Sequence, residues 1–320
     1  MGRVVVTGKV PKPALDILRR AGHEVDAWES EDQQSREQLL AQVCGADALV
    51  TLLTEQVDGE LLDAAGDQLR VVANVAVGYN NIDVEACRER GVVATNTPGV
   101  LTDATADLAM ALILMTTRRL GEGERVIRSR TPWQWGMFYL LGSGLQRKTL
   151  GVIGLGSIGA ATARRARAFG MHVIYSSRSQ ADPTLENELL AHRVDLDTLL
   201  TESDVVSVHA PYSPATHHLL GAEQFAAMKP TAYVINTARG PIIDEEALAA
   251  ALHGGQIAGA GLDVFEDEPQ VHPGLLDCEN AVLVPHLGSA TVETRTAMAT
   301  LAADNAVAVL AGEDPPTPIG

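Results

Sequence analysis

A glycine-rich loop constrains this chain more than any other segment. Residues 150–153 are apolar, as in a buried strand, and residues 160–169 have the pattern of a helix. Between them stand Gly154, Gly156 and Gly159, in G-x-G-x-x-G order. In this context the first glycine permits a tight turn, the second lets the backbone approach a pyrophosphate, and the third lets helix and strand pack closely. The loop therefore predicts a dinucleotide site at a helix N-terminus, the alternative being an ordinary glycine-rich turn.

Composition and charge exclude several classes of partner. The 320 residues carry 24 Lys and Arg against 41 Asp and Glu, and the formal net charge of −17 argues against nucleic acid and anionic membranes. No leader-like pattern opens the sequence, and the longest apolar run, residues 108–115, is too short to span a bilayer. The three cysteines lie far apart, which predicts neither a zinc site nor disulfides. We therefore expect a cytoplasmic protein without a metal.

Strand-like and helix-like runs alternate along the chain, which is the pattern of parallel α/β sheets. A chain of 320 residues is too long for one ordinary core, so we expect two domains. The first series of predicted strands covers residues 4–7, 24–28, 48–52, 70–75 and 92–95. The second series covers residues 150–153, 172–176, 204–208, 232–236, 258–262 and 281–285. Six strands suffice for a complete doubly wound nucleotide domain.

Two predicted helices indicate which parts of the chain belong to each domain. Residues 102–120 contain a run that is apolar on every side, which predicts a buried helix. Residues 291–311 carry apolar side chains at helical spacing, and we expect this helix to return to the first domain. The predicted fold is thus two doubly wound parallel-sheet domains. They are a discontinuous, flavodoxin-like substrate domain of residues 1–100 and 290–320, and a Rossmann nucleotide-binding domain of residues 101–289.

Two segments have no clear place in these sheets. Aromatic residues form only 4% of the chain, yet Trp133, Trp135, Phe138 and Tyr139 gather in one stretch. They indicate either a satellite hydrophobic cluster or an arm that packs on a second subunit, since Trp and Tyr favour interfaces. The proline-rich residues 314–318 cannot be helical, and we expect them to fray.

Three polar side chains follow three predicted strands of the second series, where ligands of open α/β sheets bind. They are Arg239, Glu268 and His286. Taken singly, they are typical of a surface arginine, a solvated acidic loop and a structural histidine. Together, and after a dinucleotide loop, they suit hydride transfer from a nicotinamide to a carbonyl. An imidazole can protonate the carbonyl oxygen, a carboxylate can orient that imidazole, and a guanidinium can clamp the carboxylate of a 2-keto acid.

The segments that carry these residues closely resemble the D-isomer-specific 2-hydroxyacid dehydrogenases, over nearly the whole chain. Within that family the sequence is most similar to the glyoxylate/hydroxypyruvate reductases. Besides the glycine loop, the matching segments are residues 74–83, 96–102, 236–240, 261–269 and 285–290.

The resemblance implies a catalytic set in which Arg239 binds the substrate carboxylate, His286 protonates the carbonyl oxygen and Glu268 tunes His286. The implied substrate-binding residues are Val77, Gly78, Arg239 and Ser289. The implied cofactor-binding residues are Thr105, Gly154, Gly156, Ser157, Ile158, Gly159, Ser176, Ser177, Arg178, Ser179, His209, Ala210, Pro211, Thr216, Thr237, Ala238, Asp263, His286 and Gly288. The resemblance also implies an interdomain cleft that closes on a small anionic 2-keto or 2-hydroxy acid, and a homodimer joined through the nucleotide domains.

The segment after the second strand of the nucleotide domain bears on the choice of cofactor. An NAD site usually carries an acid there for the ribose 2′-hydroxyl, whereas this chain has Ser176, Ser177, Arg178 and Ser179. A guanidinium and hydroxyls would bind a 2′-phosphate. We therefore expect NADPH to be preferred, with NADH possible; the alternative is that Arg178 simply points into water.

Several alternatives stay open at this point. Within the family, a D-lactate-type or D-3-phosphoglycerate-type dehydrogenase would share the same segments. Formate dehydrogenases pair the histidine with Gln, so Glu268 argues against them. A different class of function is a dinucleotide-sensing scaffold whose output is protein binding, and the intact set of Arg239, Glu268 and His286 argues against it.

Overall fold

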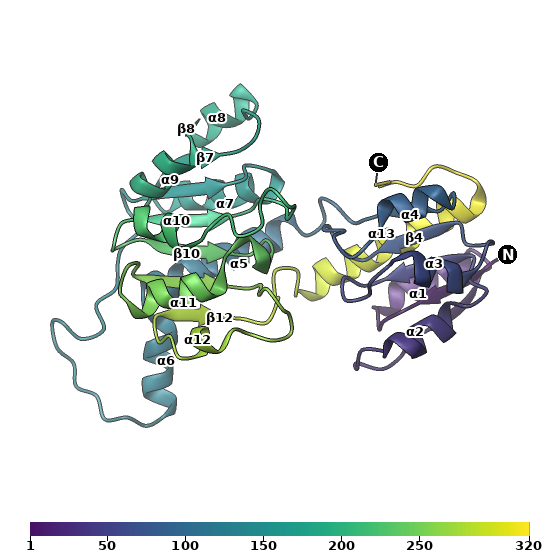
Figure 1. Cartoon of the computed structure of the whole chain (residues 1–320), viewed down its shortest axis with the longest axis horizontal. Helices are drawn as coiled ribbons and strands as arrows, with labels where there is room; N and C mark the ends of the chain where they lie inside the picture. Colours follow the sequence, from purple (N-terminus) through teal and green to yellow (C-terminus); the bar gives the residue numbers. More distant parts are fainter. Residues whose placement is uncertain (320) are drawn as a thin grey trace. The chain divides into compact units, whose positions relative to one another are not determined.

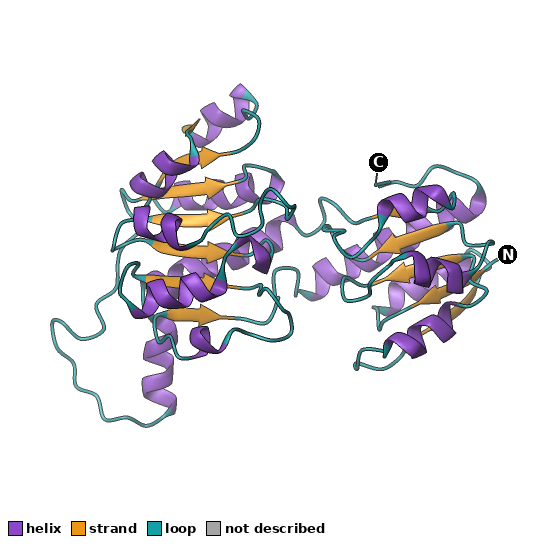
Figure 2. Ribbon diagram, in the orientation of Figure 1, coloured by secondary structure: helices purple, strands orange, loops and turns teal. Residues whose placement is uncertain are grey.

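The computed structural model describes residues 1–319, which divide into two compact units. Unit 2 comprises Thr102–Ser289, and unit 1 comprises Met1–Leu101 together with the described residues from Ala290 on. Figure 1 labels their elements, and Figure 2 shows that each unit is a sheet flanked by helices. Every strand pairing in both sheets is parallel. The predicted fold class of two doubly wound α/β domains is confirmed.

Unit 1 is built on a five-stranded sheet with the order β2-β1-β3-β4-β5, which is the flavodoxin-like order. Its strands are β1 (Arg3–Val6), β2 (Glu24–Ala27), β3 (Ala48–Thr51), β4 (Val71–Asn74) and β5 (Val93–Thr95). Its helices are α1 (Lys12–Arg20), α2 (Arg36–Val43), α3 (Gly59–Ala65), α4 (Val84–Glu89) and α13 (Val292–Ala311).

The last helix of the chain, α13, covers one face of the unit 1 sheet. Several of its alanines, including Ala299, Ala302 and Ala306, are fully buried in one cluster with side chains of α1 and alternate side chains of the strands, such as Val4 and Val71. Small side chains let the helix approach the sheet closely. Because side chains alternate along a strand, the remaining strand residues face the opposite cluster, which α2, α3 and α4 cover.

The proline-rich segment after α13 does not fray, contrary to the expectation from its sequence. Pro318 pairs antiparallel with Thr95 at the end of β5, and Ile319 N–H donates to the carbonyl of Ala94 at 2.8 Å. The side chain of Asn305, buried in α13, bonds to both the amide and the hydroxyl of Thr317, at 3.0 and 2.8 Å. Proline prevents a helix here but does not prevent an edge pairing.

Unit 2 contains a seven-stranded sheet with the order β12-β11-β10-β9-β6-β7-β8. The strands are β6 (Thr149–Ile153), β7 (His172–Ser176), β8 (Ala191–Arg193), β9 (Val205–Val208), β10 (Tyr233–Asn236), β11 (Gly259–Leu262) and β12 (Ala281–Leu283). The helices are α5 (Thr102–Thr117), α6 (Leu120–Arg128), α7 (Ser157–Ala168), α8 (Pro183–Leu189), α9 (Leu196–Glu202), α10 (Ala222–Ala227), α11 (Glu245–His253) and α12 (Pro273–Leu276). The chain starts in the middle at β6, adds β7 and β8 on one side, and then adds β9 to β12 on the other. This is the Rossmann order with one further strand.

Strand β8 is not among the strands predicted from the sequence. It has three residues, and two of them, His192 and Arg193, are exposed. Such a strand carries neither an apolar run nor alternation, so only its pairing with β7 defines it.

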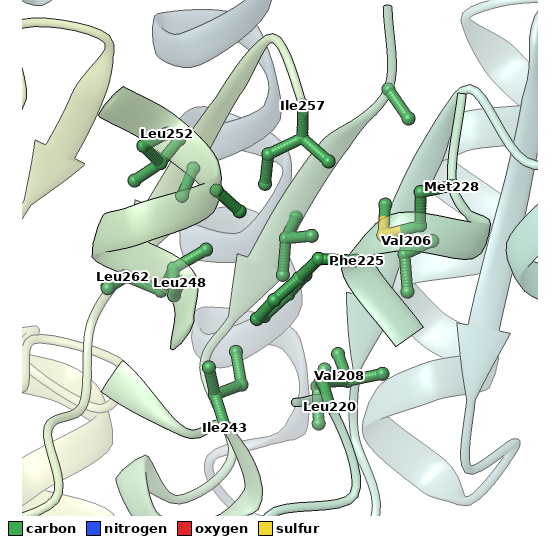
Figure 3. Packing of buried hydrophobic residues seen from close by; sticks show 14 of the residues in the cluster. Val206, Val208, Leu220, Phe225, Met228, Ile243, Leu248, Leu252, Ile257 and Leu262 are labelled. Atoms are coloured by element: carbon green, nitrogen blue, oxygen red, sulfur yellow. The ribbon is translucent and has the colours of Figure 1, made fainter. Parts of the chain in front are cut away.

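Two apolar clusters occupy the two faces of the unit 2 sheet. One lies under α9, α10 and α11, and the other under α5 and α7. Figure 3 shows the first cluster, in which the ring of Phe225 lies among Val208, Leu220, Ile243 and Leu248. The apolar helix predicted at residues 102–120 is α5, whose buried side chains belong to the second cluster.

Helix α6 and the loop that follows it project from the rest of unit 2 (Figure 1). In this loop, residues 129–147, Trp135 and Phe138 are 75% and 88% exposed. Trp133 and Tyr139 stack on each other with ring centroids 6.4 Å apart, although both are exposed. The aromatic segment is therefore an exposed arm rather than a buried satellite cluster. No helix among residues 1–319 is long and apolar enough to cross a membrane.

Candidate active site

The glycine loop follows β6, at the point where the strand order of the sheet reverses between β6 and β9. Gly154 has a φ of +92°, and a Cβ there would lie 2.7 Å from the backbone N of Ala210, in the loop after β9. A Cβ on Gly159 would lie 2.3 Å from the carbonyl oxygen of Gly154. A Cβ on Gly156 would meet nothing within 4 Å. The first and third glycines are thus required by packing, and the second leaves open space beside the loop.

That open space lies at the N-terminus of α7. The cap residue, Gly156, has no side chain to bond the first helical N–H groups, and the first turn carries no acid. The N–H groups of Ser157, Ile158 and Gly159 are therefore available to an anion, and the helix dipole favours one. The loop fits the pyrophosphate of a dinucleotide.

The four residues expected at the adenosine ribose are Ser176, the last residue of β7, and the first three residues of the loop that follows. The hydroxyl of Ser177 accepts a hydrogen bond from Leu155 N–H at 2.8 Å, which ties this loop to the glycine loop. Ser176 is half-buried, whereas Arg178 and Ser179 are exposed. Arg193 of β8 donates to the carbonyls of Ser177 and Arg178, at 2.9 and 3.0 Å. Sequence reasoning missed Arg193, because only the pairing of β8 places it beside this loop.

The loop after β9 contains His209, Ala210, Pro211 and Thr216. The half-buried imidazole of His209 bonds to Ser207 Oγ at 2.8 Å, and burial lowers the pKa of His209 to about 4. This side chain is therefore neutral at physiological pH. The hydroxyl of Thr216 donates to the carbonyl of Pro211 at 2.9 Å and closes the loop on itself.

His286 and Glu268 meet at the carboxyl edge of the same sheet. His286 follows β12, Glu268 follows β11, and the distance from His286 Nδ1 to Glu268 Oε2 is 2.7 Å. Burial raises the pKa of Glu268, but the hydrogen bond and charge of His286 outweigh it, and the net pKa lies below its ordinary value. The carboxylate is thus ionised and accepts the Nδ1 proton. His286 has a φ of +51°, a left-handed conformation that is uncommon outside glycine and is often found at functional sites.

Arg239 follows β10, the strand next to β11 in the sheet. Its Nη1 donates to the carbonyl of Ala238 at 2.6 Å, which is the one hydrogen bond that this guanidinium makes among the described residues. Burial lowers the pKa of Arg239, and the nearby charge of Glu268 opposes that change. Asn236 fixes the turn, since its side chain bonds to Ala238 N–H and to the Arg239 carbonyl, at 3.0 and 2.9 Å. Several guanidinium donors therefore remain for an anionic ligand.

Gly240 brings the Arg239 loop against the Glu268 loop. A Cβ on Gly240 would lie 1.9 Å from the carbonyl carbon of Phe265 and 2.4 Å from the backbone N of Glu266. Both neighbours are backbone atoms, so no side-chain rotation could make room. Phe265 N–H in turn donates to Glu268 Oε1 at 3.0 Å. The two loops are therefore in direct backbone contact.

A pair of glutamates fastens the Glu268 loop to α11. Glu245 N–H donates to Glu266 Oε1 at 2.8 Å, and Glu266 N–H donates to Glu245 Oε1 at 2.9 Å. Burial raises the pKa of Glu245. His218 Nε2 contacts Glu266 Oε2 at 2.9 Å. The segment after β9 is therefore also connected to the Glu268 loop. The acidic residues of this loop, which taken singly are typical of a solvated surface loop, thus include an internal anchor.

Asp263 lies at the end of β11 and is fully buried. Its carboxylate accepts hydrogen bonds from the backbone N–H groups of Leu287 and Gly288 at 2.5 and 2.8 Å, and its carbonyl accepts from His286 N–H. The hydroxyl of Thr105, in α5, donates to the carbonyl of Gly288 at 3.2 Å. Asp263 and Thr105 therefore both hold the segment that presents His286.

The remaining candidates lie as follows. Thr237, directly after β10, has a buried hydroxyl for which the described residues supply no hydrogen-bond partner. Val77 and Gly78 lie in the loop after β4 of unit 1, and Ser289 is the last residue of unit 2. No group of three or more His, Cys, Asp or Glu among residues 1–319 could hold a metal ion.

Comparison with known proteins gives consistent matches. Residues 110–288 match the family model described as D-isomer specific 2-hydroxyacid dehydrogenase, NAD binding domain. The chain is 48% identical to the glyoxylate reductase of Thermococcus onnurineus, over 98% of this chain and 95% of that protein. It is similar to the crystal structure of a glyoxylate reductase from Paecilomyes thermophila, with 35% identity, a TM-score of 0.88, and 99% and 98% of the two chains covered. It is also similar to that of an NADPH-dependent glyoxylate/hydroxypyruvate reductase from Sinorhizobium meliloti in complex with NADP and malonate, with 34% identity, a TM-score of 0.84, and 99% and 96% covered.

Proposed function

The chain belongs to the D-isomer-specific 2-hydroxyacid dehydrogenases, and we propose that it reduces glyoxylate or hydroxypyruvate to the corresponding D-2-hydroxy acid with a reduced nicotinamide cofactor. The observation that carries this proposal is the 2.7 Å contact between His286 and Glu268, in the unit that also holds Arg239 and the glycine loop. The names of the similar reductases support the choice of substrate.

The chain's own residues supply binding, orientation and a proton. The reduced nicotinamide, when bound, supplies the hydride. Arg239 clamps the substrate carboxylate with its free guanidinium donors, which fixes the position of the carbonyl. His286 donates a proton from Nε2 to the carbonyl oxygen, because its Nδ1 is engaged by Glu268. Glu268 stabilises the protonated imidazole and holds its ring orientation.

Unit 2 is the nucleotide-binding domain in this proposal, and unit 1 is the substrate domain. The N–H groups of Val77 and Gly78 would bind the substrate carboxylate from unit 1, and Ser289 would line the pocket. The enzyme would work in the cytoplasm, which agrees with the three free thiols of Cys44, Cys87 and Cys278.

NADPH is the cofactor that the loop after β7 favours. The exposed guanidinium of Arg178 makes no hydrogen bond to other described residues, so it is free to pair with a 2′-phosphate. The hydroxyls of Ser176 and Ser179 offer further donors. No carboxylate occupies the position where NAD sites usually carry one.

The exposed arm supports a homodimer. Large apolar side chains such as Trp135 and Phe138 are rarely left in water by a monomer, and aromatic residues are enriched in interfaces. The arm of one subunit could then contribute to the substrate pocket of the other. Replacing Tyr139 by Ala should change the preference between glyoxylate and hydroxypyruvate, and unchanged kinetics on both would end that idea.

An initial-rate screen tests the proposed function directly. Glyoxylate, hydroxypyruvate, pyruvate and phenylpyruvate are each offered with NADPH and with NADH. We expect the highest kcat/KM for glyoxylate or hydroxypyruvate with NADPH. A clear preference for pyruvate would favour a D-lactate-type enzyme, and no oxidation of either cofactor with any acid would favour a sensing scaffold. Equal or better use of NADH would contradict the cofactor preference.

A further inference from the structure

The loop after β4 in unit 1 has three consecutive carbonyl groups that are each held by a hydrogen bond. The donors come from the end of β4 and from the segment after β5. The bonds run from Thr97 N to Ala76 O at 2.9 Å, from Asn96 Nδ2 to Val77 O at 2.8 Å, and from Asn74 Nδ2 to Gly78 O at 3.2 Å.

Holding a carbonyl also orients the next amide. In a trans peptide the C=O and N–H bonds lie in one plane and point in opposite directions. The three hydrogen bonds therefore fix the N–H directions of Val77, Gly78 and Tyr79, each pointing away from the group that holds the preceding carbonyl. None of these three N–H groups donates a hydrogen bond within the described residues of unit 1. Successive free N–H groups in a fixed loop form a concave site for an anion.

The two asparagine side chains are themselves held in place. Asn74 is fully buried, and its Oδ1 accepts a hydrogen bond from Thr51 Oγ1 at 3.1 Å. The carbonyl of Asn96 accepts from the hydroxyl of Thr317 at 2.6 Å, and Thr317 is bonded in turn to the buried Asn305 of α13. The segment after α13 therefore supports the same loop.

We infer that Asn74 and Asn96 are positioning residues that preorganise the N–H groups of Val77, Gly78 and Tyr79 for the carboxylate of the substrate. The inference rests on the proposed function and adds Tyr79 N–H as a third donor. Thr317 supports Asn96 from the C-terminal segment. Preorganised donors spare the ligand the cost of ordering the loop, so affinity falls when the supports are removed.

The test uses oxamate, an unreactive 2-keto acid analogue that carries a carboxylate, as an inhibitor of the NADPH-dependent reduction of glyoxylate. Asn96→Ala removes the donor to Val77 and should raise the inhibition constant of oxamate and the KM for glyoxylate by about 3- to 10-fold, the factor that a hydrogen bond of ordinary strength represents. Because the carboxylate is held in both ground and transition states, kcat should change less than KM. The dissociation constant of NADPH should not change, because all the candidate cofactor-binding residues lie in unit 2.

Asn280→Ala is the matched control, because Asn280 Nδ2 also bonds to a loop carbonyl, that of Ala258 at 3.2 Å, but in unit 2. It should leave the inhibition constant of oxamate unchanged. Should Asn96→Ala fail to fold, Thr317→Val removes one support of Asn96 and should raise the same constant, by a smaller factor. If Asn96→Ala folds and its inhibition constant for oxamate is unchanged, the inference is overturned. If Asn96→Ala does not fold, an unchanged inhibition constant in Thr317→Val overturns it instead. Wild-type protein that neither reduces glyoxylate nor binds oxamate would overturn the proposed function instead, and the inference with it.

Discussion

The Nδ1 atom of His286 lies 2.7 Å from Oε2 of Glu268, although the two residues belong to loops that follow different strands. The contact engages one ring nitrogen and leaves Nε2 for proton exchange with a substrate. Both loops are held by buried anchors, the Asp263 carboxylate on one and the Glu245 carboxylate on the other. The geometry of the pair is therefore set by the fold before any ligand binds.

Replacing Glu268 by Gln should change the pH dependence of stability and lower the rate of turnover. The pKa of Glu268 is below its ordinary value of 4.5 in the folded protein, so its ionisation stabilises the fold above that pH, and this stabilisation is lost as pH falls through the lowered pKa. Melting temperatures measured from pH 6 to pH 3 should thus fall less steeply for the variant. The kcat for glyoxylate should also fall, because the imidazolium loses its charged partner. A stability profile and a kcat identical to those of the wild type would remove Glu268 from this role.

Replacing His286 by Ala should lower kcat by about 10²- to 10⁴-fold, the usual contribution of a positioned general acid. The measurement is a steady-state rate with saturating NADPH and glyoxylate. His172→Ala is the control, since His172 is exposed at the start of β7, and it should keep the wild-type rate. A His286→Ala enzyme with normal turnover would be decisive against the assigned proton donor.

Replacing Gly240 by Ala should destabilise the protein and disturb the catalytic set together. The new Cβ would meet the Phe265 and Glu266 backbone at less than 2.5 Å, so the Arg239 and Glu268 loops must separate. We expect a loss of about 1–3 kcal/mol in the free energy of unfolding, as for other overpacked sites, with a lower kcat/KM. Gly123→Ala, whose Cβ would meet nothing within 4 Å, is the control in urea titrations. Equal stability of the two variants would contradict the close approach.

Replacing Arg178 by Ala should raise the KM for NADPH by about 10- to 100-fold, which corresponds to one charged hydrogen bond to a phosphate. The KM for NADH should change little, because NADH has no 2′-phosphate. Arg19→Ala, which removes an exposed arginine from unit 1, controls for the change in net charge. A parallel change in both KM values would show that Arg178 does not read the 2′-phosphate.

The sequence predicts the sheets well because most strands here are buried on both faces and form apolar runs. It does not reveal β8, whose exposed His192 and Arg193 follow no apolar pattern. It also misleads at residues 314–318, where proline content indicates fraying but Thr317 and Pro318 are fastened to unit 1. The pairing of Pro318 with Thr95 joins residues far apart in the sequence, so the composition of residues 314–318 does not indicate it.

For the candidate site, residue types at strand ends suffice to select Arg239, Glu268 and His286. The contacts that hold these three side chains in place cannot be predicted from residue types at strand ends. The side chain of Asn236 bonds to the turn that carries Arg239, and Gly240 lies against the backbone of Phe265. Both contacts depend on how the loops are arranged in space. Such contacts follow from the packing of neighbouring strands and not from spacing along the chain.

The dependence of unit 1 on α13 has a consequence for protein synthesis. Met1–Leu101 leaves the ribosome before residues 292–311, and until then one face of that sheet is covered by α1 alone. Unit 2 is complete in sequence before then. Unit 1 is thus synthesised largely before unit 2 but gains its full core after it, and during that interval strand valines such as Val4 and Val71 lack their α13 partners.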